Sequence, residues 1–267
     1  MKTIELSDPR VKVQLKEGVG TVLFDDPKNF NALDAGSCGA FAQAVGWLDS
    51  QPELRVVLLR ASGKAFSVGG SIAMFSDAGD QVDELLREMT KQFHDAVACL
   101  MRMDAPVIAV VNGVCGGGGA SLTCIADMTI AAESAKITFA YTLSAISPDG
   151  GSTFALPRIV GIRKAYELMV MNPTLSAEEA KELGIVTRVV PDQDLDSEAE
   201  KLAQYLAAGP TRAFGAVKQL LLKTLDQSPE VQMGDEGESI ATLAVGKDGQ
   251  EGIQAFLQKR KPHYEGR

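Results

Sequence analysis

Two glycine-rich turns are the part of this sequence whose residue types and spacing could do chemistry. Four glycines, Gly116 to Gly119, stand in VNGVCGGGGASLTCIAD between a short apolar strand pattern and a helical pattern. A second turn, KAFSVGGSIAMF, places Gly69 and Gly70 between another strand and helix. Glycine loses more conformational entropy on folding than any other residue, so four in a row indicate a need for bare backbone. N–H groups at a helix start are unpaired and lie at the positive end of the helix dipole, which suits an anionic oxygen.

The details of the glycine run disfavour a phosphate site. No Gly-Lys-Ser/Thr follows the run, and a Gly-x-Gly-x-x-Gly fingerprint is matched only trivially within it. Two turns from separate strands could instead aim two N–H donors at one carbonyl oxygen. Close backbone packing without any ligand explains the glycines equally well, so this alternative stays open at the level of the residues.

The elements that must position these turns alternate between strand and helix over the first 150 residues. Strand patterns cover 18–26, 54–63, 106–113, 128–134 and 135–140, and helical patterns cover 35–51, 82–104 and 120–127. This alternation predicts βαβ units and a mainly parallel sheet. From about residue 150 the patterns are helical, with a Ser-x-x-Glu capping box at Ser176 and Glu179. We therefore predict an α/β core followed by a helical C-terminal region.

Composition narrows the class of protein. The 267 residues are 45% apolar and 23% charged, as in soluble globular proteins. No apolar run is long enough to span a membrane, and the first residues do not form a secretory signal, so no membrane partner is expected. The net charge of -9 argues against nucleic acid as a partner. The four cysteines show no metal spacing with His94 or His263, which predicts reduced, mostly buried thiols, a cytoplasmic location and no metal.

Six segments resemble, in the same order, members of the crotonase superfamily, the enoyl-CoA hydratases and isomerases. They are DDPKNFNALD, GKAFSVGGSIAMF, PVIAVVNGVCGGGGASLTCIADMTIAAESAKITFA, SPDGGSTFALPRIVG, LSAEEAKELGIVTRVVP and FLQKRKPHYEG. The resemblance covers essentially the whole chain and is closest to isomerase-like members with a single catalytic Asp. It implies an α/β fold of the ClpP/crotonase type, with a spiral of ββα repeats and an acyl-CoA site over 1–200. It also implies a helical region, 201–267, that serves a homotrimer or a dimer of trimers, and a role in fatty acid metabolism.

The resemblance gives the two glycine turns one shared role. It implies that the N–H groups of Gly70 and Gly118 bind the carbonyl oxygen of an acyl-CoA thioester, with Ser67, Gly69 and Gly117 beside the substrate. When a proton leaves the carbon next to the thioester, negative charge builds on that oxygen, and each donor can contribute about 3–4 kcal/mol. Coenzyme A is then part of the substrate, and no cofactor is expected.

The acid and base residues depart from the hydratase pattern. The hydratases that the chain resembles have two glutamates where Ser121 and Tyr141 stand, and neither of these side chains exchanges protons readily near neutral pH. Both are expected to contact the substrate. Asp149, in SPDGGS, matches the catalytic carboxylate of isomerase-like members, so we expect a double-bond shift by proton transfer through Asp149. An ordinary turn aspartate is the alternative, since Asp before Gly-Gly is common in turns.

Other functions stay open. His94 matches a histidine of 4-chlorobenzoyl-CoA dehalogenase, so Asp149 and His94 could act together in hydrolysis, although a His on a packed helix is often only a satisfied polar group. Enoyl-CoA hydration is a further alternative. A non-catalytic acyl-CoA-binding or RNA-associated protein would suit the missing glutamates.

The resemblance also implies contacts with CoA itself. Lys28 matches a basic position that meets the CoA phosphates, and Ala32 belongs to the same loop. Phe256 and Lys259 match a C-terminal segment that meets the nucleotide, often across a subunit contact. A solvated cationic helix end explains the basic residues equally well, because the helix dipole favours cations there.

Overall fold

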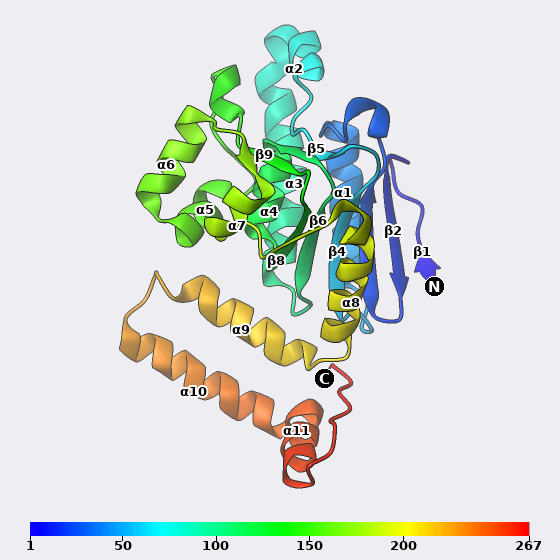
Figure 1. Ribbon diagram of the computed structural model, residues 1–267, viewed down its shortest axis with the longest axis vertical. Helices are drawn as coiled ribbons and strands as arrows, with labels where there is room; N and C mark the ends of the chain where they lie inside the picture. Colours follow the sequence, from blue (N-terminus) through cyan, green and yellow to red (C-terminus); the bar gives the residue numbers. More distant parts are fainter. Residues whose placement is uncertain (267) are drawn as a thin grey trace.

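The largest element of the structure, a computed structural model that describes residues 1–266, is a seven-stranded sheet (Figure 1). Its strands, in spatial order, are β1 (Lys2–Thr3), β2 (Val11–Lys16), β3 (Val19–Phe24), β4 (Val56–Ala61), β6 (Val107–Val111), β8 (Met128–Ala132) and β11 (Arg188–Val190). The pairs from β3 to β11 are parallel, and β1 to β3 are antiparallel. The prediction of a mainly parallel sheet is confirmed.

A smaller, four-stranded sheet carries both glycine turns. Its order is β10 (Leu175–Ser176), β9 (Lys136–Thr138), β7 (Val114–Gly116) and β5 (Ala65–Ser67). The strands β5, β7 and β9 are mutually parallel. Because the carboxyl ends of parallel strands meet at one edge, the turn after β5 and the turn after β7 are brought together.

The predicted helices are present, although some of their boundaries differ and one helical pattern is divided in two. They are α1 (Ala35–Asp49), α2 (Ile72–Ala78), α3 (Val82–Arg102), α4 (Gly118–Ile125), α5 (Ser152–Val160), α6 (Ile162–Met171), α7 (Ala177–Glu182), α8 (Leu195–Ala207), α9 (Thr211–Lys223), α10 (Pro229–Val245) and α11 (Lys247–Leu257). The helices α1, α3 and α4 each end two residues before the predicted end. The helix α4 begins at Gly118 rather than at residue 120, so two glycines of the run are helical. The pattern over 150–172 divides at Gly161 into α5 and α6. The capping box of Ser176 and Glu179 opens α7 as predicted.

Helices cover both faces of the main sheet. On one side α1 and α3 pack in a core that includes Phe41, Leu48, Phe93 and Leu100. On the other side α8 packs on β4, β6 and β8. The helix α8 runs across residue 200, and the division of the chain at that position stays a prediction.

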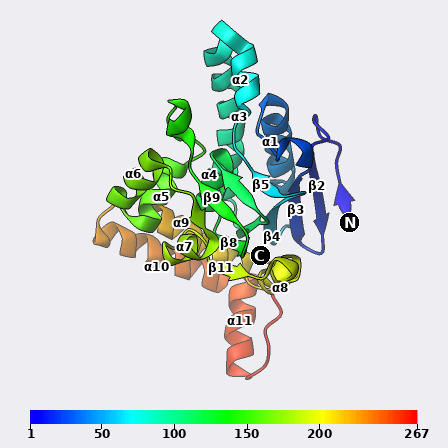
Figure 2. The same cartoon turned by 45° about the horizontal axis from the view of Figure 1, so that its top comes forward.

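The C-terminal helices stand apart from the sheet. Figure 1 places α9 to α11 at the end of the molecule opposite to α2, and Figure 2 places α11 there. The helical C-terminal region is as expected. No helix of the described residues combines the length and apolar character needed to cross a membrane.

Candidate active site

The two glycine turns touch each other through their backbones. Gly69 has φ +87°, and a Cβ there would lie 3.0 Å from the carbonyl oxygen of Gly116 and from the nitrogen of Gly118. Gly117 has φ +48°, and its Cβ would lie 3.4 Å from Cα of Gly69. Glycine is needed for both the backbone angle and the close approach. Backbone packing is therefore one reason for these glycines, and it is also what brings the neighbouring N–H groups to one place.

The N–H groups of Gly70 and Gly118 are left out of the surrounding backbone pairing. Leu33 donates to the carbonyl of Gly69 at 2.7 Å and accepts from the N–H of Ser71 at 2.8 Å, so this bridge does not use Gly70 N–H. Gly118 is the first residue of α4, where an N–H has no acceptor within the helix. Both glycines line the same cavity. Two donors are thus available to one ligand oxygen.

That cavity has a volume of about 500 Å³ and is mainly apolar. Its lining comes from α1 to α3 and from the segment 140–149, and it includes Leu33, Cys38, Phe75, Leu86, Met89, Phe93, Gly117, Tyr141, Leu143, Ile146 and Asp149. Sequence reasoning missed the apolar members, because strands and helices far apart in the chain supply them. Their only signal was the apolar periodicity of the helix over 82–104, which marks burial rather than a binding wall.

Asp149 is held by the two residues that replace the hydratase glutamates. The Tyr141 hydroxyl donates to Oδ1 of Asp149 at 2.6 Å. Ser121 Oγ lies 2.8 Å from the Tyr141 hydroxyl and 3.0 Å from the carbonyl oxygen of Asp149. Ser121 and Tyr141 are buried. Burial, together with the charge of Asp149, raises the pKa of Tyr141, so this phenol remains a donor at neutral pH.

His94 approaches the other oxygen of the same carboxylate. Its Nε2 lies 3.3 Å from Oδ2 of Asp149 and accepts a hydrogen bond from the N–H of Gly150 at 3.1 Å. The imidazole is about half exposed, so it is not a fully packed core residue. The structure thus brings together Asp149 and His94, the pair that the sequence analysis considered for hydrolysis.

Other expected contacts lie around the site or away from it. Ser67 is buried, and its Oγ accepts from Gly69 N–H at 3.1 Å, so this hydroxyl supports the turn. Lys28 is exposed and Ala32 is half-buried in the loop before α1. Phe256 and Lys259 are exposed at the end of α11, at the far end of the molecule from α2, which lines the cavity (Figure 2). One chain does not bring these two residues to the cavity, and their role stays a prediction.

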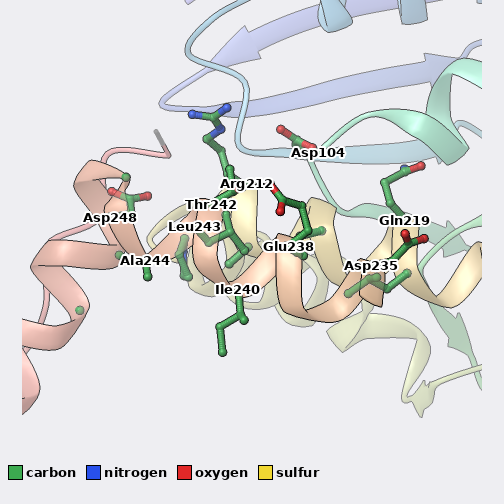
Figure 3. A pocket seen from close by; sticks show the side chains of 18 of the residues that line it. Asp104, Arg212, Gln219, Asp235, Glu238, Ile240, Thr242, Leu243, Ala244 and Asp248 are labelled. Atoms are coloured by element: carbon green, nitrogen blue, oxygen red, sulfur yellow. Dashed lines mark hydrogen bonds between the residues drawn. The ribbon is translucent and has the colours of Figure 1, made fainter. Parts of the chain in front are cut away.

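A larger cavity, of about 830 Å³, lies among the C-terminal helices. Its charged side chains come from α9 to α11 and from the loop after α3, and they are Asp104, Arg212, Lys223, Asp235, Glu238 and Asp248. Figure 3 labels all of these except Lys223. Carboxylates outnumber cations in this lining, which is unfavourable for the phosphates of CoA. None of the expected site residues line it.

The comparisons with known proteins agree with this arrangement. The sequence model described as enoyl-CoA hydratase/isomerase matches residues 14–267. A protein of Rhodobacter capsulatus named "Probable enoyl-CoA hydratase" is 34% identical over 257 residues, 96% of this chain and 98% of the relative. The 1,2-epoxyphenylacetyl-CoA isomerase of Escherichia coli is 31% identical over 254 residues, 95% of this chain and 97% of that protein.

Solved structures show the same fold. An enoyl-CoA hydratase from Polaromonas superimposes with a TM-score of 0.90 at 28% identity, over 95% of this chain and 99% of that one. The match of the family model spans the main sheet, both glycine turns, Asp149 and the C-terminal helices. This chain belongs to the enoyl-CoA hydratase/isomerase family and is an enzyme of the crotonase superfamily.

Proposed function

We propose that this enzyme shifts a double bond in an acyl-CoA thioester, with Asp149 as the acid and base and with Gly70 and Gly118 binding the enolate oxygen. One observation carries the proposal: a single cavity is lined by two available N–H donors and by one carboxylate, that of Asp149, among the described residues. One carboxylate is enough for this reaction, because the proton that leaves one carbon returns to another.

The electrons can be followed through the reaction. A carboxylate oxygen of Asp149 takes a proton from the α carbon of a 3-enoyl thioester, and the C–H electron pair moves into an enolate. Its charge rests on the thioester oxygen, where Gly70 and Gly118 donate. The protonated Asp149 then returns the proton to the γ carbon. The α–β bond becomes double, the β–γ bond becomes single, and the thioester is conjugated.

The lining of the cavity favours an apolar acyl group. Side chains such as Leu33, Phe75, Met89 and Phe93 offer contact area but no charge to a polar substituent. Burying apolar surface contributes about 25 cal/mol per Å². A hydrocarbon chain or ring therefore fits the space beside Gly70 and Gly118, with the CoA portion extending out of the cavity.

Hydration is less well supported than isomerisation. Addition of water in the two-glutamate manner needs two carboxylates to handle protons, whereas Ser121 and Tyr141 bond to each other at 2.8 Å. Hydrolysis through Asp149 is the second candidate, because the 3.3 Å approach of His94 to Oδ2 could support a base that activates water. In that reaction the carboxylate of Asp149 would displace halide from a carbon–halogen bond and form an ester. Water that has lost a proton to His94 would then cleave the ester, releasing the hydroxy product and the Asp149 carboxylate.

Ultraviolet absorbance during incubation with a 3-enoyl-CoA tests the proposal, since conjugation with the thioester adds an absorption band. We expect turnover by the wild type and a loss of about 100-fold or more in Asp149→Asn, because an amide cannot accept the proton. Asp226→Asn, at an exposed aspartate, is the matched control. The proposal would be contradicted if the wild type only converted a 2-enoyl-CoA to the hydroxy product. It would also be contradicted if Asp149→Asn kept more than about a tenth of the wild-type activity.

A further inference from the structure

We propose that Tyr141 is a positioning residue: its hydroxyl holds Oδ1 of Asp149, so that Oδ2 is the oxygen that reacts with the substrate. The inference rests on the proposed role of Asp149 as the reacting carboxylate. It applies equally to proton transfer and to ester formation, because both need one free, correctly aimed oxygen.

The first argument is the count of hydroxyl protons. Tyr141 has one, and it is donated to Oδ1 of Asp149 over 2.6 Å. In the 2.8 Å contact between the two hydroxyls, Ser121 is therefore the one that can donate, and the Tyr141 oxygen accepts. Hydrogen bonds to an ionised acceptor are short and about twice as strong as neutral ones, so Oδ1 is strongly engaged. Burial keeps the phenol ring of Tyr141 in place.

The second argument concerns the opposite side of the carboxylate. Nε2 of His94 accepts from Gly150 N–H, and a nitrogen that accepts carries no proton to donate to Oδ2. The Gly150 N–H thus keeps the neutral imidazole from capping Oδ2 at 3.3 Å. Cys38, on α1, lines the same cavity as Asp149, and burial raises the pKa of its thiol to about 12. Its neutral thiol adds no competing charge.

Ser121 has a supporting role that other groups can partly replace. Its single proton has three acceptors in reach: the Tyr141 oxygen, the carbonyl of Asp149 and, at 3.4 Å, the carbonyl of Gly117. That carbonyl also accepts from Ser152 Oγ at 2.8 Å and from Ser152 N–H at 3.2 Å. Loss of the Ser121 hydroxyl therefore leaves both the loop and the Tyr141–Asp149 bond in place. Removing the Ser121 hydroxyl should therefore lower kcat less than removing the Tyr141 hydroxyl.

The test separates positioning from packing. Tyr141→Phe keeps the buried ring and removes only the hydroxyl, and Tyr166→Phe makes the same change at a tyrosine that is 70% exposed. We expect kcat to fall about tenfold or more in Tyr141→Phe, since a hydrogen bond to a charged group contributes at least that factor. KM should change less than about twofold, because no group that binds CoA is altered. Ser121→Ala should lose less than Tyr141→Phe, and Tyr166→Phe nothing.

A crystal structure of Tyr141→Phe gives a readout that does not depend on turnover. The carboxylate of Asp149 should turn away from its wild-type orientation once Oδ1 has lost its donor. An unchanged kcat, or a rise in KM at constant kcat, would overturn the proposal. If the wild type shows no acyl-CoA turnover, the proposed function fails by itself. The orientation of Asp149 then decides the positioning role: a turned carboxylate supports it, and an unchanged one ends it.

Discussion

The contact between the two glycine turns can be tested with Gly69→Ala. At φ +87° a non-glycine residue costs about 1–3 kcal/mol of strain. The added Cβ would also lie 3.0 Å from Gly118 N and from the Gly116 carbonyl, which are backbone atoms and cannot rotate away. The turns must therefore separate by a few tenths of an ångström, and the N–H of Gly118 moves with them.

The expected loss of activity follows from that movement. Displacing one donor of an oxyanion hole lowers kcat by about 100- to 1,000-fold. The matched control is Gly161→Ala: Gly161 has φ +80°, and its Cβ would meet no atom within 4 Å. The strain shared by both variants should lower Tm by about 2–12 °C, and the backbone contact should lower the Tm of Gly69→Ala further. Only Gly69→Ala should lose kcat.

Two measurements on one preparation decide the matter, a thermal melt and the specific activity of the folded fraction. Equal activity in folded Gly69→Ala and Gly161→Ala would refute the reasoning, because the glycine contact would then serve packing alone. Loss of activity in both would place the cause in backbone strain rather than in the oxyanion hole.

Three further predictions concern single side chains. Gly118→Val, whose Cβ would lie 2.8 Å from Leu33 Cδ1, should lower turnover about 100-fold by specific activity. The thiol of Cys38 is buried, and burial raises its pKa to about 12. It should therefore react with iodoacetamide at pH 8 only after the protein unfolds, which a titration of free thiols before and after unfolding measures. Lys218→Met should lower the free energy of unfolding in urea by about 1–3 kcal/mol. The carboxylate of Asp127, 2.7 Å away and 26% exposed, loses its cation but keeps the N–H of Val107.

Much of the fold could be predicted because local patterns and tertiary environment agree. Val56 to Leu59 are fully buried, so β4 reads as a continuous apolar run. The strand β2 alternates buried and exposed residues and lies outside the predicted set, although Val11, Val13 and Leu15 show the period of a half-buried strand. The helix α4 begins at Gly118, two residues before its predicted start, because the low helix propensity of glycine gave no signal for a helix there.

The site divides in the same way between local and long-range features. The glycine turns and Asp149 are local motifs, and the structure brings Gly70, Gly118 and Asp149 to one cavity. The bond from Tyr141 to Asp149 joins residues eight positions apart through an irregular loop, and Ser121 comes from another element. No sequence period encodes such contacts, so the support that Ser121 and Tyr141 give to the carboxylate was not predicted, and their contact with the substrate stays a prediction.

The two halves of the site depend on different kinds of structure. The donors of Gly70 and Gly118 are fixed by backbone contact between two strand ends, where even one added Cβ is too close. The carboxylate of Asp149 is placed by side chains, Tyr141 on one oxygen and His94 near the other. Side chains can be exchanged without moving the strands, whereas the glycines cannot. A family that keeps the oxyanion hole can therefore change its reaction by substituting residues such as Ser121 and Tyr141, and in this chain those positions support one carboxylate in place of supplying two.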